Sequence, residues 1–278
     1  MFKSKKQRSS IPIEDCDRVS SLPDSIICHI LSFLPTKDTV ATSILSERWK
    51  PLWLSVLTLD FTDHSFFSEI ATICSQMHSV MLSRDNTLPI RSFRFKYCVT
   101  YDQPNDIIQL IIAAIQRRTE TLELNMLFKS LDMKLASNIF TCRTLTVLKL
   151  KHLSILRDIP QINNTTSLLK TLHLDCVNFN THKRIVDFLL SFPILEELQT
   201  NKVKVIRFRK FVPKTADEIK IKCLPNLVTA KLSDNKPIPL FLLSKARSLS
   251  IKLVSKILFH FTKQFTVWWF LSNVFPSL

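Results

Sequence analysis

Two different spacings of hydrophobic residues divide the chain. Between residues 17 and 60, apolar side chains recur every three or four positions, which is the spacing of one face of a helix. Beyond residue 60, many follow the pattern L-x-x-L-x-L, in which the fourth and sixth positions point to one side of a short strand. The sequence therefore predicts an α/β fold, with a helical domain at 17–60 followed by a strand-rich domain at 61–278.

The N-terminal domain is predicted to contain three helices. Pro23 suits the first turn of the first helix, and Pro35 ends that helix. Thr36 is expected to cap the second helix, and Ser46 or Glu47 to open the third. The apolar residues of these helices are Ile26, Ile27, Ile30, Leu31, Leu34, Val40, Ile44, Leu45, Trp49, Leu52 and Trp53. Three short helices cannot bury so many large side chains among themselves, so we expect part of their surface to bind a partner.

The strand pattern recurs through the second domain. The matched strands centre on their fourth positions, which are Phe93, Leu122, Leu148, Leu172, Leu198, Ala230 and Leu249. From Leu122 onward these positions are 26, 24, 26, 32 and 19 residues apart, within or near the range of leucine-rich repeats. Helical patterns at 104–118 and 181–190 fill two of the gaps. The spacing predicts an irregular leucine-rich-repeat solenoid of parallel strands and helices.

The residue between the two buried positions of each strand is predicted to point to the open, concave face of the sheet. That column consists of Arg94, Glu123, Lys149, His173, Gln199, Lys231 and Ser250. It is a mixed polar set in which no two residues form a catalytic pair. The rest of the sequence contains no catalytic motif either. We therefore expect this face to bind a target protein.

The helical domain resembles the F-box, and specifically the F-box of plant proteins with leucine-rich repeats. The similar residues are Leu22–Pro23, ILSFLP at 30–35, the region Thr39–Ser43, Ser46-x-Arg48-Trp49 and Leu52–Trp53. One departure is Glu47, where the family usually has lysine. Three segments of the second domain are also similar to this family: FTCRTLTVLKL, LLKTLHLDCVNF and LLSFPILEEL. The chain thus resembles the FBD-associated F-box-like family, without a detectable FBD region.

The resemblance implies a non-catalytic subunit of an SCF-type cullin–RING ubiquitin ligase, which needs no cofactor and no metal. In such a protein the F-box binds a Skp-type adaptor, and through it cullin, while the repeats hold a protein substrate. The residues expected to bind the adaptor are Leu22, Pro23, Ile26, Ile30, Leu31, Leu34, Trp49, Leu52 and Trp53.

Composition excludes several classes of enzyme. The chain has no glycine, whereas phosphate-binding loops depend on it, so Walker loops and dinucleotide-binding motifs are excluded. Seven cysteines lie far apart without a CxxC pair, and the seven histidines form no metal-binding spacing. Free thiols without a secretory signal predict a reducing compartment, the cytoplasm or the nucleus.

The net charge of +15 leaves a second interpretation open. Residues 1–16 are predicted to form a basic disordered tail, and residues 202–222 contain eight Lys or Arg against two acidic residues. Such runs are usually solvated surfaces, but they also fit a basic repeat scaffold that binds an anionic ligand or nucleic acid, with a non-functional F-box. Aromatic residues that would stack on bases are not interleaved, which disfavours nucleic acid.

The C-terminal residues 257–278 are apolar, but they do not predict a membrane anchor. Their charge-free run from Gln264 to Pro276 has only 13 residues, whereas a spanning helix needs about 20. Leu278 fits the first position of a further strand. The array is therefore expected to end within a repeat, without the polar capping repeat that solenoids need.

Overall fold

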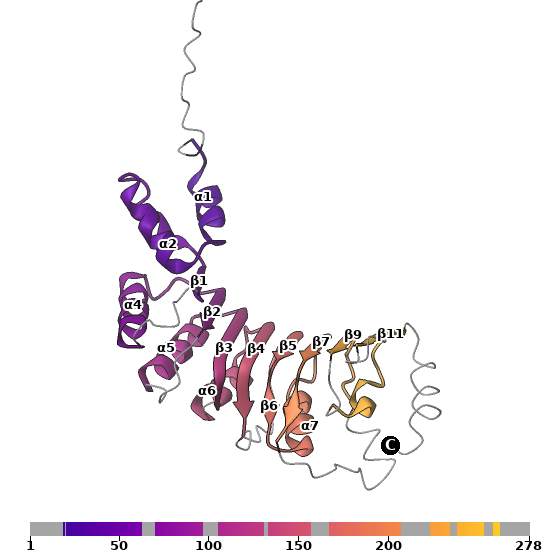
Figure 1. The fold of residues 1–278 in the computed structure, drawn as a ribbon. Helices are drawn as coiled ribbons and strands as arrows, with labels where there is room; N and C mark the ends of the chain where they lie inside the picture. Colours follow the sequence, from indigo (N-terminus) through magenta and orange to yellow (C-terminus); the bar gives the residue numbers. More distant parts are fainter. Residues whose placement is uncertain are drawn as a thin grey trace, which may run out of the picture.

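A computed structural model of the protein describes residues 19, 21–62, 70–96, 105–130, 133–156, 167–206, 223–233, 238–252 and 258–261. A small group of helices precedes a sheet that has helices along one face (Figure 1). This agrees with the predicted α/β class. Three predicted features lie outside the described residues: the basic tail at 1–16, most of the basic stretch (207–222), and the C-terminal segment from 262 to 278.

The N-terminal domain consists of short helices. They are α1 (Asp24–Leu31), α2 (Thr36–Ala41), the 3-10 helix η1 (Thr42–Ile44) and α3 (Leu52–Ser55). α1 begins directly after Pro23, which is the N-cap and lies one residue before the predicted first turn. The third helix is shorter than predicted, because residues 47–51 form turns and α3 begins only after Pro51.

A core of five buried side chains holds these helices together: Ile27, Leu31, Trp49, Leu52 and Val56. An ion pair closes the domain, since Nε and Nη2 of Arg48 lie 3.0 and 2.6 Å from Oδ1 of Asp24 in α1. So small a core provides little stability alone. Contacts between this domain and the sheet therefore matter for its fold.

The strands form one sheet in which neighbours along the chain are mostly neighbours in space, in the order β1-β2-β3-β4-β5-β7-β9-β10-β11. They are β1 (Thr58–Phe61), β2 (Ser92–Lys96), β3 (Thr121–Ser130), β4 (Val147–Ile155), β5 (Thr171–Asp175), β6 (Asn178–Phe179), β7 (Glu197–Asn201), β8 (Lys204–Val205), β9 (Thr229–Ser233), β10 (Ser248–Lys252) and β11 (Leu258–Phe261). The strands from β1 to β10 pair in parallel, whereas β11 pairs antiparallel with β10. The pattern in the sequence did not predict β1, β6 or β11.

The predicted register of the strands is confirmed. The fourth positions of the pattern form one column across the sheet, to which β1 adds Leu59: Phe93, Leu122, Leu148, Leu172, Leu198, Ala230 and Leu249. All of these side chains are buried. A backbone contact repeats beside them: the carbonyl of Glu120 accepts the N–H groups of Thr146 and Val147 at 2.9 and 3.0 Å, and equivalent carbonyls do the same at the start of later strands. Successive units are therefore built alike.

Helices cover one face of the sheet (Figure 1). They are α4 (Ile70–Ser83), α5 (Asn105–Gln116), α6 (Met133–Thr141), α7 (His182–Leu190) and the 3-10 helix η2 (Leu240–Leu243). α5 and α7 lie where the sequence predicts helices, and Phe188 of α7 packs on Phe140 of α6 with ring centroids 5.8 Å apart. The predicted leucine-rich-repeat solenoid is not shown: the described strands form one sheet, in which β6 and β8 lie off the main strand order and β11 pairs antiparallel with β10.

Three residues adopt a left-handed backbone at the same place in successive units. His152, Cys176 and Lys202 have φ angles of 51°, 53° and 49°. Each comes directly after a residue that pairs with the neighbouring strand. Glycine usually occupies such positions, but the chain has none. The turn separates β5 from β6 and β7 from β8, and the N–H of Cys176 donates to the carbonyl of Asn201 at 2.9 Å.

Candidate docking surfaces

The N-terminal domain exposes more large hydrophobic side chains than it buries. The exposed ones are Val19, Ile26, Ile30, Phe33, Leu34, Ile44 and Leu45. Phe33 is 71% exposed and Ile44 is 89% exposed, which is far from the usual environment of such residues. Apolar surface concentrated in so small a domain marks an interaction site.

The nine residues predicted to bind an adaptor fall into three groups. Pro23, Ile26, Ile30 and Leu34 are exposed, and Leu22 and Trp53 are half-buried. Leu31, Trp49 and Leu52 are buried in the domain's own core. These three side chains pack inside the domain, where they support the surface that the exposed residues form. Contact of the exposed residues with an adaptor stays a prediction.

The sequence did not identify the most exposed residues of this surface. The predicted second helix would place Ile44 and Leu45 on one face together with Val40, but α2 ends at Ala41 and the chain continues as η1. Ile44 and Leu45 are consequently exposed, while Val40 is half-buried. Phe33 lies in the turn after α1, where a helical spacing gives no information.

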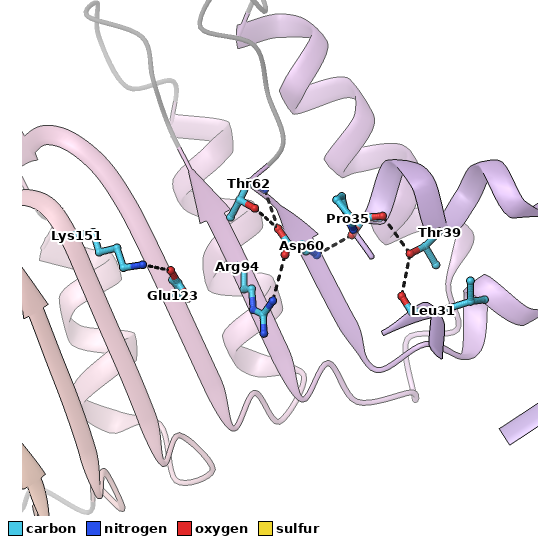
Figure 2. Close-up of polar contacts among 9 residues, drawn as sticks. Leu31, Pro35, Thr39, Asp60, Thr62, Arg94, Glu123 and Lys151 are labelled. Atoms are coloured by element: carbon cyan, nitrogen blue, oxygen red, sulfur yellow. Dashed lines mark hydrogen bonds and ion pairs between the residues drawn. The ribbon is translucent and has the colours of Figure 1, made fainter. Parts of the chain in front are cut away.

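The buried Thr36 joins the helical domain to the sheet, and the buried Thr39 holds the helical domain together. Thr36 does not cap α2, since Pro35 precedes the helix and no side chain caps it. The hydroxyl oxygen of Thr36 instead accepts the backbone N–H of Asp60 in β1, at 2.7 Å. Figure 2 shows Thr39 beside Leu31 and Pro35, whose carbonyls accept its hydroxyl at 3.2 and 3.1 Å. The exposed apolar surface is therefore anchored to the first strand.

The predicted column of polar residues is confirmed as a structural feature. Arg94, Glu123, Lys149, His173, Gln199, Lys231 and Ser250 lie in register on adjacent strands. β1 adds Asp60 to the same column. Whether this face binds a target stays a prediction.

Ion pairs tie the face together along its length. Nη1 of Arg94 lies 3.3 Å from Oδ2 of Asp60, and Nζ of Lys151 lies 2.5 Å from Oε1 of Glu123 (Figure 2). Lys231 approaches Glu197 more loosely, at 3.9 Å. These pairs orient long side chains and are partly exposed, so each adds little stability.

His173 lies at the centre of the column and lacks a partner. Its Nε2 is buried and makes no hydrogen bond. Burial, followed by the nearby charge of Lys149, lowers the pKa of His173 below its usual value. The imidazole is therefore neutral near pH 7. Lys149 forms no ion pair with any described carboxylate. Lys149 and His173 can therefore form hydrogen bonds with a partner molecule.

The described residues offer neither a cluster of metal ligands nor a helix that could span a membrane. No group of three or more His, Cys, Asp or Glu side chains is arranged there to hold a metal ion. No helix within the described ranges has the length and hydropathy required to cross a bilayer.

Comparison with known families identifies the N-terminal domain. The F-box domain family matches residues 19–60, which contain all the helices of this domain and the start of β1. The chain is thus a mixed α/β protein with an N-terminal F-box domain.

Relatives in Arabidopsis thaliana extend the similarity into the sheet. An FBD-associated F-box protein is 34% identical over 192 residues, covering 66% of this chain and 45% of that protein. An F-box/FBD/LRR-repeat protein is 37% identical over 187 residues, with 66% and 40% covered, and an F-box/LRR-repeat protein is 34% identical over 189 residues, with 66% and 49% covered. The chain is homologous to plant F-box/LRR-repeat proteins, and it spans less than half the length of these three.

Proposed function

We propose that this chain is the substrate receptor of an SCF-type cullin–RING ubiquitin ligase. The observation that supports this best is the exposed apolar surface of the F-box domain. A small domain that exposes seven large hydrophobic side chains while burying five needs a partner. The partner proposed is a Skp-type adaptor, which links the chain to cullin.

The strand–helix units are, in this proposal, leucine-rich repeats. Three features support it: the buried column of mostly leucine residues, the spacing near 26 residues, and the carbonyl that repeats its contact at successive strands. The polar column from Arg94 to Ser250 binds the protein target. The chain itself is non-catalytic and acts in the cytoplasm or the nucleus, raising the effective concentration of the target near a separate enzyme.

Co-purification with a Skp-type adaptor at increasing salt tests the proposal. At about 1 M salt, electrostatic attraction is almost fully screened, whereas apolar contacts persist. We expect the adaptor to remain bound under these conditions. Loss of the adaptor at high salt, together with salt-sensitive retention of anionic ligands, would support instead a basic scaffold with a non-functional F-box.

A further inference from the structure

The face of the sheet that carries the polar column has more cations than carboxylates. Side chains at alternate positions of each strand share this face, because the positions between them are buried. Its cations are Arg94, Lys96, Lys149, Lys151, Lys231 and Lys252. Its carboxylates are Asp60, Glu123, Asp175 and Glu197. The excess of positive charge favours a partner with acidic groups.

Three of these carboxylates are engaged within the face itself. Asp60 and Glu123 form the ion pairs with Arg94 and Lys151. Asp175 accepts a hydrogen bond at 2.8 Å from Nδ2 of the neighbouring amide, Asn201. Negative charge on the face is therefore compensated, whereas part of its positive charge is not.

Two lysines of the column retain the capacity to bind an external carboxylate. None of the ion pairs among the described residues includes Lys149. The side chain of Lys231 is 56% exposed, and its distance of 3.9 Å from Glu197 is too long for a hydrogen bond. Three steps between neighbouring strands, from β4 through β5 and β7 to β9, separate the two lysines. Since neighbouring strands lie about 4.8 Å apart, Lys149 and Lys231 stand about 14 Å apart across the sheet.

We propose that the polar column binds an acidic peptide segment of the target protein, with one carboxylate at Lys149 and a second at Lys231. An extended peptide rises about 3.3 Å per residue and points every second side chain the same way, so acidic residues four positions apart match this separation. Gln199 lies between the two lysines and is exposed, so its amide can bond to the peptide backbone. This mode of binding rests on the proposed role of the column in holding a target, and it names the chemistry of that target.

A nucleic acid fits this face less well than a peptide. The carboxylates of Glu123 and Glu197 lie beside the central residues of the column, where they repel a continuous chain of phosphates. Two separate carboxylates four residues apart avoid that repulsion. The column also contains no Phe, Tyr or Trp on which bases could stack.

A capped nonapeptide of serine and threonine, with glutamate at its third and seventh positions, tests this site in the full chain. We expect the peptide to shift the imidazole NMR signals of His173, which lies between the two lysines in the column. The signals of His182 should not move, because α7 lies on the helical face of the sheet (Figure 1). Lys149→Met is expected to weaken binding about fivefold, since it removes a charged hydrogen-bond donor, and Lys149→Arg should keep it. The matched control is Lys183→Met at an exposed lysine of α7, which should bind the peptide as the wild type does.

Peptide controls test the charge and the spacing separately. A peptide with glutamine at both positions, and one with its glutamates only two residues apart, should each bind at least about fivefold more weakly. Equal binding of the glutamine peptide, or wild-type affinity in Lys149→Met, would overturn the proposal. Displacement of the peptide by a short single-stranded oligothymidylate at equal concentration would overturn it too, and would identify nucleic acid as the occupant.

Titration of the same variants with a Skp-type adaptor separates this site from the proposed receptor function. Lys149→Met should keep wild-type affinity for the adaptor, because Lys149 lies on the sheet and not on the F-box domain. A chain that binds the adaptor but not the peptide would refute only the acidic target. A chain that binds the peptide but not the adaptor would contradict only the receptor function.

Discussion

Single polar atoms decide how the two parts of this molecule are joined. The sequence predicts Thr36 as a helix cap, since threonine is common at that position. Its actual partner is the N–H of Asp60, 24 residues further along the chain. No local pattern contains that information, because the contact depends on where α2 lies against β1. The same is true of Arg84, whose buried contact with Trp53 spans 31 residues.

Replacing Thr36 with valine is expected to lower the free energy of unfolding by about 1–3 kcal/mol. The change keeps the shape of the side chain but leaves the N–H of Asp60 without its acceptor. Chemical denaturation measures the difference. The matched control is Thr141→Val on the exposed end of α6, where the hydroxyl bonds only to its own helix, and where we expect a change within about 0.5 kcal/mol. Equal effects at both positions would contradict this role for Thr36.

His173 is expected to make stability depend on pH. Its pKa is lowered in the folded protein by burial and by Lys149, so the unfolded chain binds more protons below about pH 6.5. Stability should therefore be fully present above the unfolded-state pKa and fall as the pH drops through that value towards the lower folded-state pKa. NMR titration of the imidazole measures the shift. Lys149→Met should raise the pKa of His173, and an unchanged value would contradict the proximity of the two charges.

Hydrophobic spacing predicted the elements that bury a regular stripe of side chains. α7, with Ile185 and Leu189 inward, and the strands around Leu148 and Leu172 are examples. β1 was not predicted, because Leu59 and Phe61 come directly after the helices of the F-box and no earlier strand sets a spacing for them. β11 escaped because its antiparallel pairing belongs to no repeat. Such strands form because of the strand with which they pair. The spacing of hydrophobic residues along the chain does not identify that partner strand.

Lys202 offers a test of the left-handed turns. Lys202→Gly is expected to raise the free energy of unfolding by about 0.5 kcal/mol, because relief of the clash at Cβ outweighs the greater freedom of glycine in the unfolded chain. Lys202→Val is expected to lower it by about 1 kcal/mol or more, since a β-branched side chain fits this backbone worst. Both changes are measured by chemical denaturation.

Lys204 is the matched control for that turn. It is also exposed and lies two residues away, but in the extended strand β8. Lys204→Gly should therefore destabilise the protein by about 0.5–1 kcal/mol. If glycine destabilised the protein equally at both positions, the left-handed backbone at Lys202 would not be a source of lowered stability.

The molecule as a whole presents two surfaces of different chemistry. One is apolar and lies on the F-box domain, and the other is the polar column along the sheet. The column was predictable residue by residue, because strand alternation determines which side chains share a face. The apolar surface was predicted only in outline, since its Ile44 and Phe33 are exposed by the ends of helices and not by their periodicity.

If the F-box domain binds the adaptor and the polar column binds the target, mutations should separate the two functions. Changing Lys149, His173 and Gln199 together to alanine should abolish capture of the target while adaptor binding is kept. Affinity purification with the proteasome inhibited, followed by mass spectrometry, measures both in one experiment. The control replaces Gln116, Lys183 and Lys245, which are exposed polar residues away from the column. Loss of both functions in the first variant, or of neither, would count against a modular receptor.

A calorimetric titration of the full chain with a Skp-type adaptor measures directly whether the F-box surface binds it. We expect Ile30→Asp and Phe33→Asp each to weaken binding by at least about 2 kcal/mol, because each places a charge on the exposed apolar surface of the F-box domain. Ile206→Asp, at an exposed isoleucine beyond β8, should bind as the wild type does. Wild-type affinity in both F-box variants, or no measurable binding by the wild type itself, would contradict the proposal that this surface docks the adaptor.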